Sequence, residues 1–158
     1  VELDSVNGGA IQGNHFSGSG TLIQLNGSQN VDVAGNMMDS GSQRGIVLSN
    51  GSTQDRVQGN VIGQTSQAGI EVGNGTPGTP SPAQCGASSS SPNNTLQGNV
   101  ITTSALGIYL ECGNGVNELL QGNVSSGGNP NDFFDANSSC DSNTWQGDAG
   151  SGNQGCVK

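Results

Sequence analysis

The motifs Val57-Gln58-Gly59-Asn60 and Ile70-Glu71-Val72, which follow one another in the chain, decide its fold. The first motif, an apolar residue, any residue, glycine and asparagine, has five further copies. These are Ile11-Gln12-Gly13-Asn14, Val33-Ala34-Gly35-Asn36, Leu96-Gln97-Gly98-Asn99, Leu120-Gln121-Gly122-Asn123 and the degenerate Trp145-Gln146-Gly147-Asp148. The second motif recurs as Val1-Glu2-Leu3, Ile23-Gln24-Leu25, Ile46-Val47-Leu48, Ile108-Tyr109-Leu110 and Phe134-Asp135-Ala136. Internal repeats of this length are typical of solenoid proteins.

The period of the repeat is close to two dozen residues. The first apolar residues of the second motif, counted from Val1 to Val157, lie 22, 23, 24, 38, 26 and 23 residues apart. The long step contains a segment rich in Ser, Pro and Gly, residues 73–92. We therefore predict one domain, residues 1–158, in which residues 73–92 form an inserted loop between coils.

The motifs alternate apolar and polar residues, which is the periodicity of a β-strand. Asn-Gly and Gly-Ser turn signals separate the short strands. A leucine-rich repeat has a similar period, but its usual helical return segment has no counterpart in the pattern. We predict an all-β solenoid in which each coil pairs with the next at ~4.8 Å. Its narrow core is built from three columns: Val1/Ile23/Ile46/Ile70/Ile108/Phe134, Leu3/Leu25/Leu48/Val72/Leu110/Ala136 and Ile11/Val33/Val57/Leu96/Leu120/Trp145.

The composition agrees with a narrow core and restricts the partners. Only 30% of the 158 residues are hydrophobic, and 28 are glycine. The net charge is −9 with three basic residues, so the clustered cations that nucleic acids and anionic membranes require are missing. No apolar run approaches the ~20 residues of a membrane span. We expect neither a nucleic-acid nor a membrane partner.

The four cysteines indicate an extracellular, secreted protein with disulfide bonds, because their number is even and no Cys-x-x-Cys occurs. A Cys85–Cys112 bond would attach the insertion to the stack, and a Cys140–Cys156 bond would close the last coil. Four cysteines allow two other pairings, which the sequence leaves open.

The asparagines of the first motif are expected to have a structural role. Asparagine tolerates the left-handed conformation that a corner needs, and stacked amides form hydrogen-bonded ladders. The predicted ladder contains Asn14, Asn36, Asn60, Asn99 and Asn123, and Asp148 ends the series.

The residues between the apolar positions of the second motif form an outward column: Glu2, Gln24, Val47, Glu71, Tyr109 and Asp135. Glu71 and Asp135 are the candidate catalytic carboxylates, about 9–10 Å apart if they lie two coils apart, a separation that suits an inverting glycosidase. Tyr109 between them would stack on a sugar, so these three residues are also the candidate ligand site. No Lys, Arg or His lies beside them in the pattern, which argues against catalysis.

The alternation of Gly-Asn-x-Ile with Gly-Ile-x-Leu resembles the right-handed parallel β-helix repeats of pectate-lyase-like and periplasmic copper-protein-like families. The resemblance implies a single-stranded right-handed parallel β-helix of about six coils. That fold hosts lyases, hydrolases, epimerases, adhesins and scaffolds. A pectate-lyase-like site would need clustered Asp ligands for Ca²⁺ with a nearby Arg or Lys, and a polygalacturonase-like site would need Gly-His-Gly and Arg-x-Lys. Neither is present, so we expect no cofactor and no metal; Ca²⁺ is left open as an alternative that no residue pattern supports.

The two ends of the chain fall at the same phase of the repeat. Val157 is expected at the position of Val1, and Lys158 at that of Glu2. We therefore expect subunits to stack head-to-tail, with Val1 and Leu3 meeting Trp145 and Val157, and Lys158 near Glu2. The alternative is that the chain is part of a longer β-helix.

The resulting functional hypothesis is an extracellular, non-catalytic β-helix scaffold that stacks into filaments. The alternative is a carbohydrate-binding or polysaccharide-degrading module of the lyase, hydrolase or epimerase type, or a fragment of one.

Overall fold

The structure is a computed structural model that describes residues 1–39, 42–73, 90–102, 104–127, 131–137 and 143–157. Every regular element in these residues is a β-strand. No helix among them is long and apolar enough to span a membrane. Most of the predicted insertion, residues 74–89, lies outside the described residues, so the inserted loop stays a prediction.

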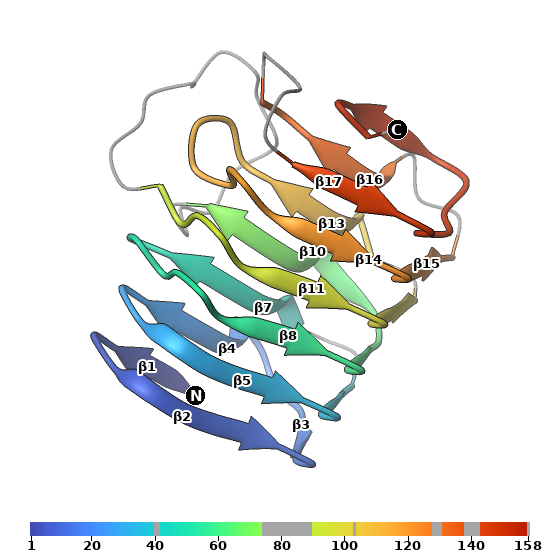
Figure 1. Ribbon diagram of the computed structural model, residues 1–158. Helices are drawn as coiled ribbons and strands as arrows, with labels where there is room; N and C mark the ends of the chain where they lie inside the picture. The colour runs from blue at the N-terminus through green and yellow to red at the C-terminus, as the bar shows by residue number, and fades with distance from the viewer. Residues whose placement is uncertain (40–41, 74–89, 103, 128–130, 138–142, 158) are drawn as a thin grey trace.

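Three parallel sheets form the walls of a right-handed parallel β-helix of about six coils (Figure 1). Sheet A contains β1 (Glu2–Asp4), β4 (Thr21–Asn26), β7 (Ser42–Ser49), β10 (Thr65–Gly73), β13 (Leu106–Leu110), β16 (Asn131–Asp135) and β18 (Asn153–Gly155). Sheet B contains β2 (Asn7–Gln12), β5 (Gln29–Ala34), β8 (Arg56–Gln58), β11 (Thr95–Gln97), β14 (Leu119–Gln121) and β17 (Thr144–Gln146). Sheet C contains β3 (His15–Phe16), β6 (Met37–Met38), β9 (Val61–Ile62), β12 (Val100–Thr102) and β15 (Val124–Ser126). The chain passes through sheets A, B and C in turn; the two motifs of the repeat lie in sheets A and B, and sheet C was not predicted.

The strand register confirms the predicted columns over most of their length. In sheet A, Ile70 pairs with Ile46 on one side and with Ile108 on the other. In sheet B, Leu96 pairs with Val57 and Leu120. All six side chains are fully buried. The third column also ends as predicted, because Trp145 pairs with Leu120.

The asparagine ladder is present along the corner between sheets B and C. Asn36 donates its Nδ2 to the Oδ1 of Asn60 at 3.0 Å, and Asn60 donates to Asn99 at 2.9 Å. Asn99 donates to Asn123 at 2.9 Å, and Asn123 donates to Asp148 at 2.7 Å. These bonds satisfy buried amides that would otherwise cost about 1–3 kcal/mol each.

The left-handed corner conformation belongs to the glycine before each ladder asparagine. The φ of Gly59 is 61°, and an added Cβ would meet no atom within 4 Å. The ladder asparagines have no positive φ. The two roles expected of asparagine are thus divided between the residues of the Gly-Asn pair, because glycine adopts this conformation without steric cost.

The glycines before Ile46, Ile70 and Ile108 are required for a different reason, whereas Ile23 follows Leu22. A Cβ on Gly69 would lie 2.6 Å from Cγ2 of Ile101 and 2.8 Å from the carbonyl oxygen of Gly107. The wall of sheet A therefore approaches sheet C closely at this point. This explains why Gly-Ile-x-Leu recurs as a unit.

The register of the sixth coil differs from the prediction. Phe133, not Phe134, pairs with Ile108, and Asp135, not Ala136, pairs with Leu110. The cause is Asp132, which is fully buried and accepts hydrogen bonds from Ser125, Ser151 and Gly152. These bonds hold Asp132 in place and direct Phe133 inward.

The predicted return of Val157 to the phase of Val1 is wrong. Asn153 pairs with Phe133 and thereby occupies the position expected for Val157. The last coil is shorter than the period predicts, because the step from Phe133 to Asn153 is 20 residues. Val157 packs, partly buried, against the core, and Lys158 lies outside the described residues.

Cys112 and Cys156 are buried, and neither is a free thiol. Their predicted partners, Cys85 and Cys140, lie outside the described residues. The pairing Cys85–Cys112 and Cys140–Cys156 therefore stays a prediction.

Candidate functional site

The outward column of sheet A follows the prediction up to Tyr109. Glu71 pairs with Val47 on one side and with Tyr109 on the other. Phe134 takes the next position, where Asp135 was expected, and its ring stacks on Tyr109 with centroids 5.5 Å apart. The structure therefore brings Glu71 and Tyr109 together and separates Asp135 from them.

Asp135 points into the solenoid and is 1% exposed. Its Oδ1 accepts from Nδ2 of Asn137 at 2.8 Å, and its Oδ2 accepts from Nδ2 of Asn143 at 3.0 Å. Nε1 of Trp145 adds a longer contact to Oδ2, 3.4 Å. These bonds satisfy a carboxylate at the upper end of the core, so the predicted Glu71–Asp135 pair does not form.

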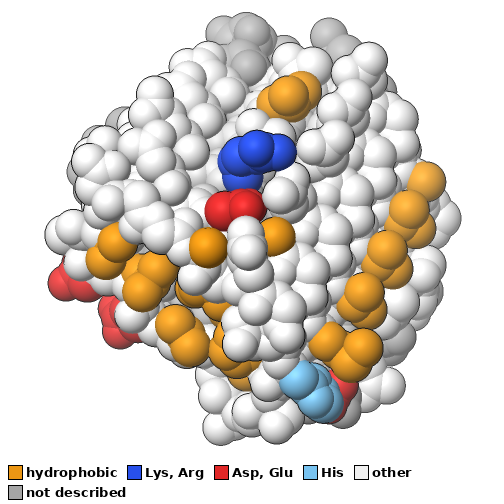
Figure 2. All heavy atoms as spheres, turned by 60° about the horizontal axis from the view of Figure 1, so that its bottom comes forward, with side chains coloured by type: hydrophobic (Ala, Val, Ile, Leu, Met, Phe, Trp, Pro, Cys, Tyr) orange, Lys and Arg blue, Asp and Glu red, His pale blue; other side chains and the backbone are white. Residues whose placement is uncertain are grey.

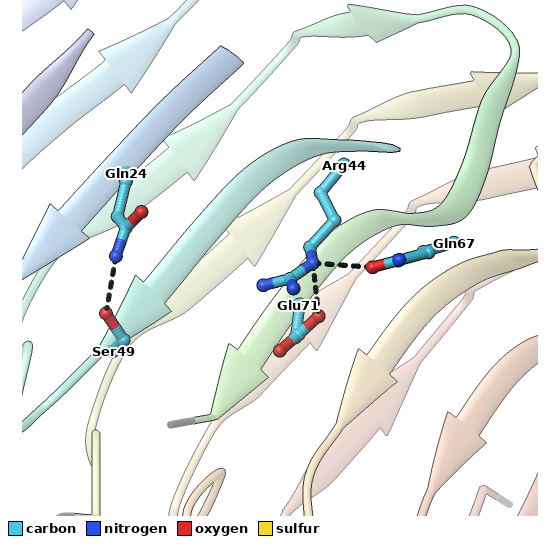
Figure 3. A network of polar contacts seen from close by, with 5 residues as sticks. All are labelled: Gln24, Arg44, Ser49, Gln67 and Glu71. Carbon is cyan, nitrogen blue, oxygen red and sulfur yellow. Dashed lines mark hydrogen bonds and ion pairs between the residues drawn. The ribbon is translucent and has the colours of Figure 1, made fainter. Parts of the chain in front are cut away.

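Arg44 lies beside Glu71, which the sequence analysis did not foresee (Figure 3). Its Nε is 3.4 Å from Oε2 of Glu71 and donates to Oε1 of Gln67 at 2.9 Å. Arg44 and Glu71 are 3% and 5% exposed. A separate contact on the same sheet joins Nε2 of Gln24 to Oγ of Ser49 at 3.5 Å.

The alternation rule places Arg44 on the inward side, since it lies two residues before Ile46. The close approach at Gly45 breaks that rule, because a Cβ there would lie 2.6 Å from the carbonyl oxygen of Gly69. A register shift between Thr65 and Ala68 of β10 lies at the same level. The only sequence signal for an outward Arg44 is the glycine that follows it.

Burial raises the pKa of Glu71 to about 7; the charge of Arg44 lowers it and that of Glu111 raises it further. Burial also raises the pKa of Tyr109, and the carboxylates of Glu111 and Glu71 add to the effect. Perturbed carboxyl groups are frequent at functional sites, although structural ion pairs produce the same shift. The Glu71 carboxyl group is therefore able to hold a proton near neutral pH beside the Arg44 cation.

The outer face of sheet A around this group is buried. A second apolar cluster lies there, containing Ala68, Leu106, Tyr109, Cys112 and Ala136, with Phe134 partly buried against it. Tyr109 itself is 7% exposed. The expected open face for a sugar chain is therefore covered at Glu71 and Tyr109.

A column of buried acids and amides inside the solenoid also escaped the sequence analysis. Oδ1 of Asp55 accepts from the amide of Val31 at 2.8 Å, and Oε2 of Glu118 accepts from the amide of Asn94 at 2.9 Å. Burial raises the pKa of Asp55 to about 6 and, against hydrogen bonds from Asn94, that of Glu118 to about 9. The only available signal was their position, two residues before Val57 and Leu120.

Sheet C carries an exposed row of apolar side chains that begins beside His15 (Figure 2). The row contains Met37, Val61, Val100 and Val124, each 38–50% exposed. Nε2 of His15 lies 2.6 Å from Oδ2 of Asp39.

The fold and the repeat define a right-handed parallel β-helix protein, the class that the sequence resemblance implied. The family model described as "Periplasmic copper-binding protein (NosD)" matches residues 1–78, just under half of the 158 residues. No curated protein and no solved structure matches the chain.

The described residues do not fit a preformed copper site. Among them, no three or more His, Cys, Asp and Glu side chains come together to hold a metal ion. His15, the only histidine of the sequence, lies in the matched segment. Its Nε2 already contacts Oδ2 of Asp39.

Proposed function

We propose that this chain is a non-catalytic structural β-helix of the extracytoplasmic space that stacks head-to-tail with further copies of itself. The observation that carries the proposal is that the repeated polar residues bond the coils to one another. The asparagine of each coil is committed to the ladder that joins the coils, and the predicted site residues Glu71, Tyr109 and Asp135 are buried.

The first coil supports axial contact. Strands β1, β2 and β3 are the edge strands of their sheets at this end. Val1 is 57% exposed, and Leu3, Val6 and Phe16 are only partly buried against the core. Figure 2, which brings this end forward, shows apolar side chains at its surface. Open strand edges beside apolar side chains favour pairing with another chain.

The joint differs from the one that the sequence predicted, because Val157 is out of phase with Val1. At the opposite end β18 presents Asn153, Gln154 and Gly155, all exposed. The contact we propose is therefore backbone pairing between β18 and the β1 of the next copy, with the polar end of one subunit against the apolar end of the other.

The extracytoplasmic location is also part of the proposal. The low content of basic residues, the absence of a free thiol among the described cysteines and the periplasmic description of the matching family support it.

Light scattering and negative-stain microscopy over a concentration series test the stacking. The Glu2→Pro variant should block stacking. The amide of Gln24 donates to the carbonyl of Val1, and the amide of Ser5 donates to the carbonyl of Asn26. Residues 1 and 5 therefore face β4, and the amide of Glu2, at an alternate position, points to the open edge. We expect fibres from the wild type and folded monomers from Glu2→Pro. Monodisperse wild-type particles at every concentration would refute stacking.

The second candidate is a carbohydrate-binding or polysaccharide-degrading module, which Arg44 beside Glu71 favours. Turnover of pectin or alginate that disappears in Glu71→Gln and persists in Glu2→Gln would establish it. We expect no turnover from either variant or from the wild type.

A further inference from the structure

A second ladder of side chains runs along the corner between sheets A and B. Its members stand two residues before the sheet B core residue in the third to sixth coils: Asp55, Asn94, Glu118 and Asn143. An oxygen of each member accepts from a main-chain amide of the coil before, over 2.8–3.0 Å. These amides belong, in order, to Val31, Asp55, Asn94 and Glu118. Acids and amides therefore serve equally as acceptors in this ladder.

A side-chain amide at a corner also supplies two donors. In the asparagine ladder, Nδ2 of Asn99 donates forward to Oδ1 of Asn123 and backward to the carbonyl oxygen of Val57, both at 2.9 Å. In the second ladder, Nδ2 of Asn94 donates to two main-chain carbonyl oxygens, one in its own coil at 3.0 Å and one in the coil before at 3.1 Å. Both ladders therefore use side-chain N–H groups to satisfy main-chain carbonyls.

Asp55 and Glu118 have a second oxygen in place of the NH₂ group of an amide. Oδ2 of Asp55 is buried and has no hydrogen-bond partner. Oε1 of Glu118 has one long contact, 3.4 Å from Nδ2 of Asn94. The carbonyls to which Asn94 donates are those of Ser91 and Ser52, and the repeat brings the corresponding carbonyls to the acids. An ionised carboxylate only accepts hydrogen bonds, whereas a protonated acid has an O–H to donate. A proton on each acid therefore restores the donor that an amide supplies.

The strands of sheet B do not favour a negative charge on either acid. Asp55 and Glu118 are each 1% exposed. Arg56 is the one basic residue on the described strands of this sheet, and it is exposed and donates to Oε1 of Gln58. The other charged residue of these strands is Asp32, which adds negative charge.

The ladder itself brings further acids. Glu118 has Asp55 below it and, above it, Asp135, which accepts from Asn143 at 3.0 Å. The other titratable residues on or beside the described strands of sheets A and C are Glu2, Asp4, His15, Asp39, Arg44, Glu71, Tyr109, Glu111 and Asp132. Burial raises the pKa of Asp55 to about 6, against the bond from Val31. Burial raises the pKa of Glu118 to about 9, against the bonds from Asn94 and with the charge of Asp55 adding to the rise.

We infer that Asp55 and Glu118 each bind a proton in the folded chain and hold it in a hydrogen bond to a main-chain carbonyl, and that the corner between sheets A and B opens when these protons are lost. The predicted insertion, residues 73–92, lies between Asp55 and Asn94 in the sequence, so the two acids lock the coils that flank it. Asp55 releases its proton first as the pH rises, and Glu118 second. The inference concerns the single chain and does not rest on the proposed stacking.

Infrared spectroscopy of the folded protein tests the protons, because a protonated carboxylic acid and a carboxylate have distinct carbonyl stretching bands. At pH 8 we expect the band of a protonated acid in the wild type and its loss in Glu118→Gln, which supplies the amide used elsewhere in the ladder. The matched control is Glu71→Gln, a buried acid outside the ladder. It should keep the band, since burial raises the pKa of Glu71 only to about 7. At pH 5 the band should be weaker in Asp55→Asn than in the wild type.

Hydrogen exchange followed by NMR tests the opening. Protection factors, which remove the intrinsic pH dependence of exchange, are compared for the amides of Asn94 and Asn36, which donate to Glu118 and Asn60. In the wild type the protection of Asn94 should fall about tenfold per pH unit between pH 7 and pH 9, because opening releases one proton. The protection of Asn36, at the corner between sheets B and C, should stay higher. In Glu118→Gln the protection of Asn94 should stay nearly constant over this range.

Four results would each overturn the inference. The first is a wild type without a protonated acid at pH 8, and the second is a band that remains in Glu118→Gln. The third is an equal and parallel loss of protection at Asn94 and Asn36, because the whole chain then unfolds and no single corner opens. The fourth is the same protection of Asn94 in the wild type and in Glu118→Gln at pH 9, which would show that the proton of Glu118 does not hold the corner.

Discussion

Asn60 donates its side-chain amide to Asn99 at 2.9 Å although 39 residues separate them in the sequence. The bond is as short as that between Asn99 and Asn123, which lie 24 residues apart. The predicted insertion between Asn60 and Asn99 therefore leaves the ladder undisturbed. The corner between sheets B and C therefore forms the same side-chain hydrogen bond whether 24 or 39 residues separate the two asparagines.

We predict that Asn99→Asp destabilises the protein by about 3–5 kcal/mol. The carboxylate keeps the bonds from Asn60, but it loses both donors and faces Oδ1 of Asn123 in a fully buried position. Urea denaturation measures the loss. Asn14→Asp, at the exposed first rung, is the matched control and should cost much less. Equal costs at the two positions would contradict a directional ladder.

Substitution of Ile70 by Asp should cost several kcal/mol, because it places a carboxylate between Ile46 and Ile108 in a column without water. Val61→Asp, which introduces the same group on the outward side of sheet C at a residue 44% exposed, should cost less than 1 kcal/mol, roughly a surface effect. Thermal denaturation of the two variants is the comparison. Similar melting temperatures would refute the assignment of inward and outward faces.

The predictable part of the fold is the part in which the pattern is unambiguous. Ile46, Ile70 and Ile108 each follow a glycine and stand two residues before a second apolar residue, so their register follows from the period. In the sixth coil Phe133 and Phe134 are adjacent, and alternation alone does not decide which of them points inward. The bonds of Asp132 decide it, and they depend on Ser151, which is distant in sequence.

The candidate site was predicted less well because its residues break the rules that make the fold predictable. Arg44 has the parity of a core residue, and only the lack of space at Gly45 explains its outward position. Asp55 and Glu118 are acids at inward positions, which an apolar pattern excludes. Glu71 and Tyr109 were placed on the correct face, but the burial of that face involves contacts that no single-coil pattern contains.

Gly69→Ala tests the close approach of sheets A and C. The added methyl group would lie 2.6 Å from a side-chain carbon of Ile101, so one of the two walls must move. We expect a loss of about 1–3 kcal/mol in the free energy of unfolding. Gly98→Asn is the control, since its φ of 62° suits asparagine and its surroundings are open. A harmless Gly69→Ala would show that the sheets are not in contact there.

The stability of the protein should decrease as the pH rises from about 4 to about 9. Burial raises the pKa of Asp55 to about 6, of Glu71 to about 7 and of Glu118 to about 9. Between the ordinary carboxyl pKa and these values the folded state binds more protons than the unfolded state, so each unit of pH costs stability. Asp132 acts in the opposite sense at lower pH: burial opposes its ionisation, but its hydrogen bonds outweigh burial and lower its pKa.

Urea denaturation at pH 5, 7 and 9 measures this dependence. Glu118→Gln keeps an acceptor for Asn94 and cannot ionise, so its stability should fall less between pH 5 and pH 9 than that of the wild type. Glu2→Gln, at an exposed position, should leave the slope unchanged. A wild-type protein that becomes more stable from pH 5 to pH 9 would contradict the burial of these acids.

Fibre diffraction from aligned assemblies tests the central claim, head-to-tail stacking of a structural β-helix, most directly. Stacked subunits should give a ~4.8 Å reflection along the fibre axis, from strands that run across it. They should also give an axial subunit repeat of about 34 Å, because pairing of β18 with β1 of the next copy stacks the seven strands of sheet A per subunit at that spacing. A 4.8 Å reflection perpendicular to the fibre axis would contradict the account, as would a preparation of the wild type that forms no ordered assembly at any concentration.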